Sequence, residues 1–321
     1  MKAAVLKKFG SPLSIEALPD PMLGTGEVIV DVVAAGVVPY AAEVISNQRP
    51  YTLELPIVLG AGAIGRLRAV GPDATELKVG DWVSCDSTVR ARDNPITPDS
   101  TLQGWTARGE GGLKLASHFH HGSWAEQILV PTENAIPIGI IDRSEAAKWC
   151  VMGLVLVPYG GLLAVDLKAG ETVVISGATG NFGSAAVAVA LAMGAARVVA
   201  PGRNEMMLEE LARRFGSRVV TVKLSGDKAE DSERIKAAAA APIDVVLDLM
   251  PPSVGANVVR TAAMTVREFG RVALMGGVAD DLALPCRWLM HNGITIRGQW
   301  MYPPGSQPGH RESHPLGTTQ P

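Results

Sequence analysis

The stretch Val173-Val174-Ile175-Ser176-Gly177-Ala178-Thr179-Gly180-Asn181-Phe182-Gly183 decides the fold of this chain. An apolar run typical of a buried strand ends in a glycine turn that opens a helix. Gly177 allows the turn, Gly180 lets the backbone approach a pyrophosphate, and Gly183 permits close packing of helix on strand. The helix start offers free N–H groups and a positive dipole end to the phosphates. The turn predicts a dinucleotide site that also includes Thr179, Asn181 and Phe182; the alternative is a packing turn without a ligand.

The sequence after this turn repeats the pattern of a strand followed by a helix. Apolar strand patterns alternate with amphipathic helix patterns, which implies a parallel sheet covered on both faces. The spacing of the glycines, GxxGxxG, would be a weak signal alone, and this context strengthens it. We expect strands at 172–176, 197–200, 218–222, 243–249, 271–275 and 293–301, and helices at 182–193, 205–215, 228–240 and 254–266.

The residues after the second of these strands bear on the choice of cofactor. Gly202, Arg203 and Asn204 follow the strand, and no acid precedes Glu205. An acid at this place accepts a hydrogen bond from the ribose of NAD, whereas an arginine suits the 2′-phosphate of NADP. We therefore expect all three residues to contact the cofactor and the cofactor to be NADP(H). The alternative is a solvated arginine on a surface loop.

The first half of the chain has a different pattern. Short strand-like runs at 3–6, 27–33, 57–70, 81–85 and 124–130 are separated by turn signals, which is typical of a partly open β-barrel. A helix is expected at about 40–47. Residues 89–121 show no period and are predicted to form a long surface lobe, with partial order as an open alternative.

The composition limits the class of protein. Of the 321 residues, 47% are hydrophobic and 19% charged, so a large core is expected; the net charge of −3 gives no reason to expect a nucleic acid or an anionic membrane as partner. We expect no signal peptide and no apolar run that crosses a bilayer. Cys85, Cys150 and Cys286 lie far apart, which favours free thiols in a reducing cytoplasm over a disulfide framework.

With both halves in view, the chain resembles the medium-chain dehydrogenase/reductase superfamily from Met1 to about Pro303. It resembles most the zinc-free, quinone-oxidoreductase-like and enoyl-reductase-like branch. The resemblance implies an α/β protein with a GroES-like β-rich domain at 1–145, a Rossmann domain with a doubly wound parallel sheet that binds NADP at 146–303, and an active-site cleft between them. Besides the glycine turn, the resemblance rests on the segments Gly26-Glu27-Val28, Pro56-Ile57-Val58-Leu59-Gly60, Val79-Gly80-Asp81-Trp82-Val83, Gly122-Ser123-Trp124-Ala125-Glu126 and Lys168-Ala169-Gly170-Glu171-Thr172-Val173.

The positions that ligate catalytic zinc in zinc-dependent relatives hold other residues here. Those positions correspond to Val38, to Ala61 and Gly62 after Gly60, and to Gly153. Valine, alanine and glycine side chains cannot ligate a metal, so we expect no zinc. Residues 89–121 also lack the cysteines that hold structural zinc in many relatives. His118, His120 and His121 could still attract a metal, although a solvated loop is the favoured interpretation.

Without zinc, the reaction depends on hydrogen-bond donors beside the reacting carbonyl. The resemblance places Tyr40 and Tyr51 at the border of the cleft, and a phenol can bind a carbonyl oxygen and relay a proton. The alternative for each is a packed side chain. Zinc-free relatives often carry asparagine and aspartate where this chain has Val38 and Ala41. Gly276 matches the place where the backbone approaches the nicotinamide ring.

These features predict a zinc-independent, NADPH-dependent oxidoreductase that transfers a hydride to a quinone, enone, aldehyde or ketone. The alternative is an NADP(H)-binding protein with weak or no catalysis, because the family pattern stops after Pro304 and the last part of the catalytic domain is missing. Residues 304–321 are predicted to form an atypical disordered tail. A zinc alcohol dehydrogenase is a third interpretation, which the missing ligands disfavour. Relatives pair through the last Rossmann strand, here 293–301, which implies a homodimer.

Overall fold

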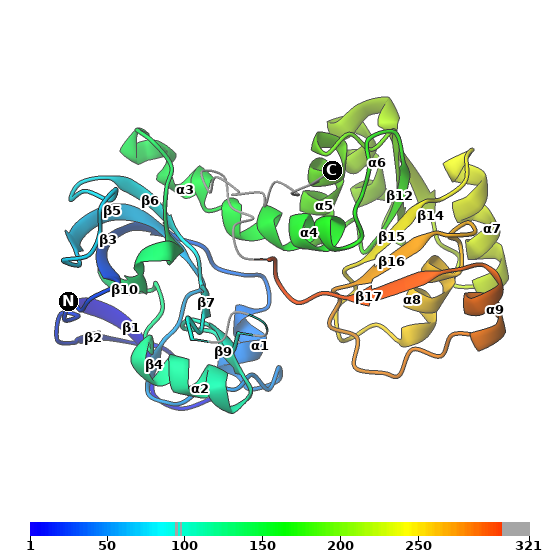
Figure 1. Ribbon diagram of the computed structural model, residues 1–321. Coiled ribbons are helices and arrows are strands. Elements are labelled where there is room, and N and C mark those ends of the chain that lie inside the picture. Colours follow the sequence, from blue (N-terminus) through cyan, green and yellow to red (C-terminus); the bar gives the residue numbers. More distant parts are fainter. Residues whose placement is uncertain (94–95, 97, 304–321) are drawn as a thin grey trace, which may run out of the picture. The chain divides into compact units, whose positions relative to one another are not determined.

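The computed structural model describes residues 1–93, 96 and 98–303, which fold into two compact units (Figure 1). The first unit covers Met1–Gly153 and the second begins at Leu154. The sequence places this boundary between residues 145 and 146; in the structure the chain passes from one unit to the next within helix α4 (Met152–Ala164). The expected tail, 304–321, lies outside the described residues.

Antiparallel strands form the core of the first unit, as the sequence predicts. Five strands pair in the order β10-β3-β5-β6-β11, and three more pair in the order β2-β1-β4. Apolar side chains such as Val28, Val30, Leu67 and Val83 are buried within the larger sheet. The elements are β1 (Lys2–Leu6), β2 (Ser14–Ala17), β3 (Glu27–Ala35), α1 (Ala41–Ile45), β4 (Ile57–Val58), β5 (Ala63–Val70), β6 (Trp82–Cys85), β10 (Gln127–Pro131), η1 (Thr132–Asn134), β11 (Ala135–Pro137), η2 (Arg143–Glu145) and α3 (Ala146–Trp149).

The strand expected at 57–70 is interrupted. β4 and β5 are separated by a bend in which Gly60 and Gly62 have φ angles of +118° and +80°. L-residues with side chains rarely adopt such angles, so the two glycines break the strand. The bend holds Ala61 and Gly62, which correspond to two of the zinc-ligand positions of the relatives.

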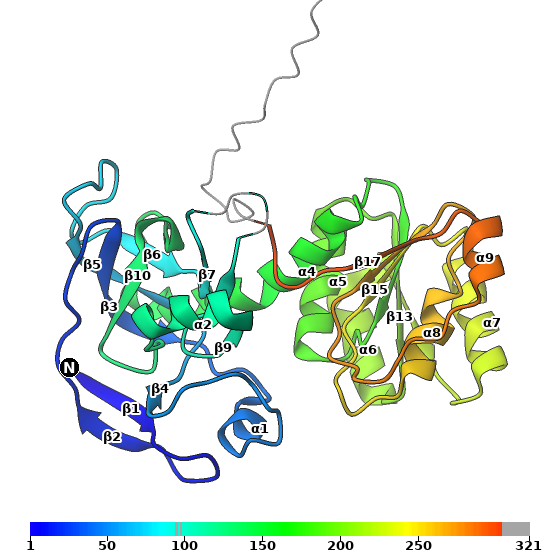
Figure 2. The same cartoon turned by 60° about the horizontal axis from the view of Figure 1, so that its bottom comes forward.

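Residues 89–121, expected as a partly ordered surface lobe without a period, contain regular strands and a helix. A three-stranded antiparallel sheet, β7-β8-β9, packs against helix α2, as Figure 2 shows. Gly112 of α2 lies directly against the backbone of Ser100, where a larger residue would collide. Strands of three residues are too short to reveal a period. Their bounds are β7 (Thr88–Arg90), β8 (Ser100–Leu102), β9 (Thr106–Arg108) and α2 (Gly109–His118).

The second unit is a doubly wound α/β fold, which confirms the predicted fold class. Its six strands are all parallel, in the order β14-β13-β12-β15-β16-β17. Side chains of α4, α5 and α6 pack on one face of the sheet, and those of α7, α8 and α9 pack on the other. The further elements are β12 (Thr172–Ser176), α5 (Asn181–Ala192), β13 (Arg197–Gly202), α6 (Glu205–Phe215), η3 (Gly216–Arg218), β14 (Val219–Lys223), α7 (Lys228–Ala239), β15 (Val245–Asp248), α8 (Ala256–Ala263), β16 (Arg271–Leu274), α9 (Cys286–His291) and β17 (Thr295–Gly298).

One helical stretch contradicts the expectation that no segment is apolar enough to cross a bilayer. Among the described residues, Arg143–Ala164 is long and apolar enough to do so by length and composition alone. Its second half packs inside the second unit: a Cβ added to Gly160 would lie 2.6 Å from Cβ of Tyr302, and one added to Gly161 would lie 2.8 Å from Leu247. These contacts are those of a core helix.

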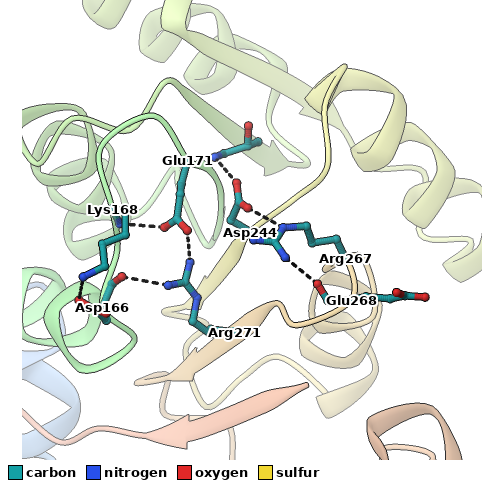
Figure 3. Close-up of polar contacts among 8 residues, drawn as sticks. Asp166, Lys168, Glu171, Asp244, Arg267, Glu268 and Arg271 are labelled. Atoms are coloured by element: carbon teal, nitrogen blue, oxygen red, sulfur yellow. Dashed lines mark hydrogen bonds and ion pairs between the residues drawn. The ribbon is translucent and has the colours of Figure 1, made fainter. Parts of the chain in front are cut away.

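A polar network ties together the amino ends of the central strands β12, β15 and β16 (Figure 3). Arg271 forms an ion pair with Glu171, and the two side chains are only 19% and 16% exposed. Asp244 accepts hydrogen bonds from the amide of Thr172 at 2.8 Å and from Nε of Arg267 at 2.7 Å. The charged groups therefore anchor the edge of the sheet opposite to the glycine turn.

Removal of Arg271 should destabilise the second unit. In an Arg271→Met variant, the half-buried Glu171 loses its partner, and we expect the free energy of unfolding to fall by about 2–4 kcal/mol. Urea unfolding followed by circular dichroism measures the loss. The control is Lys168→Ala, which removes an exposed ion pair with Asp166 and should cost less than about 1 kcal/mol. Equal losses in the two variants would contradict this account.

Candidate dinucleotide site and aromatic cluster

The glycine turn has the geometry that the sequence predicts. Gly177 has a φ of +86°, and the amide of Gly180 bonds to its carbonyl at 2.9 Å. A Cβ on Gly183 would collide with that carbonyl oxygen, whereas one on Gly180 would have it as its sole neighbour, at 3.4 Å. Gly183 thus serves packing, and Gly180 leaves open space in front of the turn.

The start of α5 offers unused backbone donors to that space. The first helical hydrogen bond runs from the amide of Ser184 to the carbonyl of Gly180 at 2.8 Å. The preceding amides, those of Asn181, Phe182 and Gly183, therefore lie outside the helical hydrogen-bond pattern. Helix α5 has 12 residues, and its first turn carries no acidic side chain. A negatively charged group in front of the turn would meet donors and the positive end of the helix dipole.

The second predicted contact region lies at the end of β13. A Cβ on Gly202 would be 3.0 Å from Cγ2 of Thr179, so this glycine lies beside the turn. The side chain of Asn204 accepts a hydrogen bond from the amide of Met207 at 3.3 Å and caps α6. Its carboxamide oxygen is therefore engaged in the fold. Arg203 is exposed, and no hydrogen bond or ion pair engages its guanidinium within the described part of the chain.

A buried carboxyl group that the sequence analysis missed stands at the same edge of the sheet. Asp248 ends β15, pairs with Ser176 at the end of β12, and is only 3% exposed. A Cβ on Gly276, just after β16, would collide with Oδ2 of Asp248. Gly276 must therefore be glycine to fit against this carboxyl group. The sequence signal was an acid at the end of the apolar run Val245-Val246-Leu247.

In the first unit, the two predicted catalytic tyrosines lie together. The rings of Tyr40 and Tyr51 are 6.3 Å apart, and Cζ of Arg49 lies 4.1 Å from the ring centre of Tyr40. Trp105 is 6.1 Å from Tyr40 and 6.5 Å from Tyr51. Burial, followed by the neighbouring Tyr51, raises the pKa of Tyr40 above its ordinary value, so its phenol keeps its proton. We call Tyr40, Tyr51, Trp105 and Trp124 the aromatic cluster.

Trp124 of this cluster contacts both loops that carry catalytic-zinc ligands in zinc-dependent relatives. Its indole Nε1 donates to the carbonyl of Gly36 at 3.2 Å, and a Cβ on Gly60 would lie 2.6 Å from its Cδ1. Trp105 is 6.0 Å away. Around Gly36 and Gly60, the side chains at the ligand positions are those of Val38 and Ala61. This donor set does not fit a zinc ion.

The three histidines each have a separate partner. His118 Nε2 lies 2.5 Å from the carboxylate of Glu27, and His120 Nε2 donates to the carbonyl of Pro56 at 2.9 Å. His121 Nδ1 accepts from the amide of Val58 at 3.3 Å, and burial, with His120 second, lowers its pKa. No group of three or more histidine, cysteine or acidic side chains suited to a metal occurs among the residues that the structure describes.

Comparison with known proteins agrees with both units. The model of the alcohol dehydrogenase GroES-like domain matches residues 24–140, and that of the zinc-binding dehydrogenase matches residues 182–311. An alcohol dehydrogenase from Moraxella sp. (strain TAE123) is 31% identical over 302 residues, which cover 93% of this chain and 84% of that protein.

Two further similar proteins are a coenzyme A thioester reductase and an alcohol dehydrogenase. An acryloyl-coenzyme A reductase from Metallosphaera sedula is 28% identical, with 87% of this chain and 77% of that protein covered. The structure of a cobalt- and zinc-bound thermostable alcohol dehydrogenase from Pyrobaculum aerophilum superposes with a TM-score of 0.71 at 26% identity, over 94% of this chain and 84% of that one. The chain thus belongs to the medium-chain dehydrogenase/reductase superfamily, and it is an oxidoreductase of the alcohol dehydrogenase type.

The glycines of the turn should respond differently to the same substitution. We expect Gly183→Ala to lower the melting temperature clearly, because the added methyl group overlaps a backbone carbonyl that cannot move without distorting β12. Gly180→Ala should leave it nearly unchanged, since its φ of −79° suits alanine and the space is open. Differential scanning fluorimetry checks both. A Gly180→Ala variant as unstable as Gly183→Ala would disprove the distinction between the two glycines.

Proposed function

We propose that this chain is a zinc-independent oxidoreductase that uses NADPH to reduce a quinone, an enone, an aldehyde or a ketone. The observation that carries the proposal is the open glycine turn with an unpaired Arg203 beside it. An anionic dinucleotide is the ligand whose charges match these groups.

The residues of the turn fit such a cofactor. The amides of Asn181, Phe182 and Gly183 would hold the pyrophosphate, and the lack of a side chain at Gly180 leaves room for it. Arg203 would bind a 2′-phosphate, because a guanidinium donates two parallel hydrogen bonds to phosphate oxygens. Gly202 and Thr179 would border the ribose, and the backbone at Gly276 would border the nicotinamide. The bound cofactor supplies the hydride.

The aromatic cluster takes the place of a metal in this proposal. Tyr40 and Tyr51 would donate hydrogen bonds to the substrate oxygen, which becomes negatively charged as the hydride arrives. The raised pKa of Tyr40 keeps its phenol protonated and able to donate. The indole and phenol rings favour a flat, apolar substrate such as a quinone or an enone. The similarity to an acryloyl-coenzyme A reductase supports an activated double bond as one possible acceptor.

The proposed assembly is a homodimer in the cytoplasm. β17 is the edge strand of the six-stranded sheet, and its outer backbone groups are available to a second copy. Cys85, Cys150 and Cys286 are all free thiols, which fits a reducing compartment. Burial raises the pKa of the Cys85 thiol to about 12, so this group stays protonated and unreactive.

Arg203 should determine the preference for the phosphorylated cofactor. In an Arg203→Ala variant, we expect the Kd for NADPH to rise by about tenfold or more, since a charge-assisted pair with phosphate is lost, while the Kd for NADH stays constant. Titration of nucleotide fluorescence measures both. Arg213→Ala, which removes an exposed arginine from α6, is the control and should change neither value. A parallel loss of NADPH and NADH binding would contradict the role of Arg203.

The tyrosines should act on turnover rather than on cofactor affinity. Tyr51→Phe and Tyr40→Phe each remove one donor, and the variant of the residue that faces the substrate oxygen should lose at least about tenfold in kcat. The Kd for NADPH should not change, because neither hydroxyl belongs to the turn. NADPH consumption with a panel of quinones, enones and aldehydes measures kcat. Unchanged kinetics in both variants would remove the tyrosines from the mechanism.

A further inference from the structure

Asp248 is a buried charged group for which the proposed function has no role so far. Its side chain lies between the ends of three strands: Ser176 of β12 on one side, and the segment after β16 on the other. The amide of Met250 donates to Oδ1 of Asp248 at 3.4 Å, and the amide of Gly276 also donates to the carboxyl group. Two backbone segments are therefore held by one carboxyl group.

The same two segments are bonded to each other. The amide of Gly277 donates to the carbonyl of Met250 at 2.8 Å, and the amide of Met275 donates to the carbonyl of Asp248 at 3.1 Å. A Cβ on Gly177 would lie 3.1 Å from the carbonyl of Leu249, so the glycine turn contacts this arrangement directly. A change at the Asp248 carboxyl group would therefore alter the backbone at Met250 and Gly276, next to the turn.

The carboxyl group has no cationic partner. Its neighbours within the described residues are the Ser176 hydroxyl from β12 and the amides of Met250 and Gly276, and no ion pair involves it. Burial raises the pKa of Asp248 to about 6, and the opposing effect of the nearby Met250 amide, Ser176 hydroxyl and Gly276 amide is smaller. The group therefore changes its charge in a range where enzymes work, and its neutral form attracts the two amides less strongly.

We propose that Asp248 is a positioning residue whose carboxylate fixes the backbone at Met250 and Gly276 for the nicotinamide half of the cofactor. The inference rests on the proposed function, because Gly276 borders the nicotinamide only if a nicotinamide dinucleotide occupies the turn. The phosphates and the adenosine half contact other residues, so they depend much less on Asp248.

The chain binds the nicotinamide half more tightly when Asp248 is ionised, and this sets the direction of the pH effect. Affinity is full above the pKa of about 6 and falls as the pH drops through it, since protonation weakens the hold on both amides. Binding of the nicotinamide in turn lowers the pKa of Asp248. In contrast, burial of the charge disfavours the folded state above this pH, so the carboxylate at Asp248 serves the site at the expense of stability.

The experiment compares two ligands on the full chain. NADP⁺ contains the nicotinamide, and 2′-phospho-ADP-ribose lacks it but keeps both the pyrophosphate and the 2′-phosphate. Calorimetric titrations between pH 5 and pH 8 give both Kd values. Because the 2′-phosphate titrates equally in both ligands, the ratio of the two Kd values isolates the nicotinamide half. For the wild-type chain, we expect the ratio of the Kd for 2′-phospho-ADP-ribose to the Kd for NADP⁺ to decrease several-fold as the pH falls from 8 to 5.

The Asp248→Asn variant should abolish this pH dependence. At pH 7.5 we expect its Kd for NADP⁺ to rise by about tenfold, with a much smaller change for 2′-phospho-ADP-ribose. The matched control is Asp244→Asn at the other end of the same strand, where the carboxylate also accepts a backbone amide. This control should lose stability but keep the wild-type ratio at every pH.

Three results would overturn the inference. A pH-independent ratio for the wild-type chain would do so without any variant, even if Asp248→Asn failed to fold. If Asp248→Asn lost the same affinity for both ligands, or if Asp244→Asn showed the same loss of affinity for NADP⁺, Asp248 would serve the fold alone. Failure of the wild-type chain to bind either ligand at any pH would instead contradict the proposed cofactor, and with it the basis of the inference.

Discussion

The contact between Gly183 and the carbonyl of Gly177 is the constraint on which the second unit depends. Helix α5 can begin immediately after β12 only because no side chain stands between its first turn and the backbone of the strand. That close approach brings the free amides of the helix to the carboxyl edge of the sheet, where β13, β15 and β16 also end. Arg203, Asp248 and Gly276 come within reach of the turn for the same reason, since parallel strands place their carboxyl ends on one edge.

In the first unit, the indole of Trp124 joins the loop at Gly36 to the loop at Gly60. A metal ion joins the loops by coordination in zinc-dependent relatives, whereas here Trp124 donates to Gly36 and packs against Gly60. The result is an apolar, aromatic centre at this place in the first unit. In the proposed reaction, neutral donors stabilise the negative charge on the substrate, and Tyr40 and Tyr51 lie 6.3 Å apart beside this centre.

Much of this arrangement could be predicted from the sequence, and the exceptions have physical reasons. The parallel sheet and the glycine turn follow from long apolar strands and regular helices, whose periods are clear. The bend at Gly60 escaped prediction because β4 has only two residues, and the sheet β7-β8-β9 did so because each of its strands has three. Asp248 was missed because burial, which gives it an unusual pKa, depends on Gly276 and Ser176 from distant parts of the chain. The pairing of Tyr40 with Tyr51 likewise involves a distant residue, because Trp105 packs against both rings.

The central claim is that this oxidoreductase works without a metal, and one measurement tests it directly. The purified chain is treated with a chelator, its zinc content is determined by elemental analysis, and NADPH oxidation is followed with a quinone and an enone before and after zinc is added back. The account predicts turnover by the metal-free chain and no gain from stoichiometric zinc. Turnover that is absent without zinc and restored by one equivalent would contradict the account, as would the absence of turnover under both conditions.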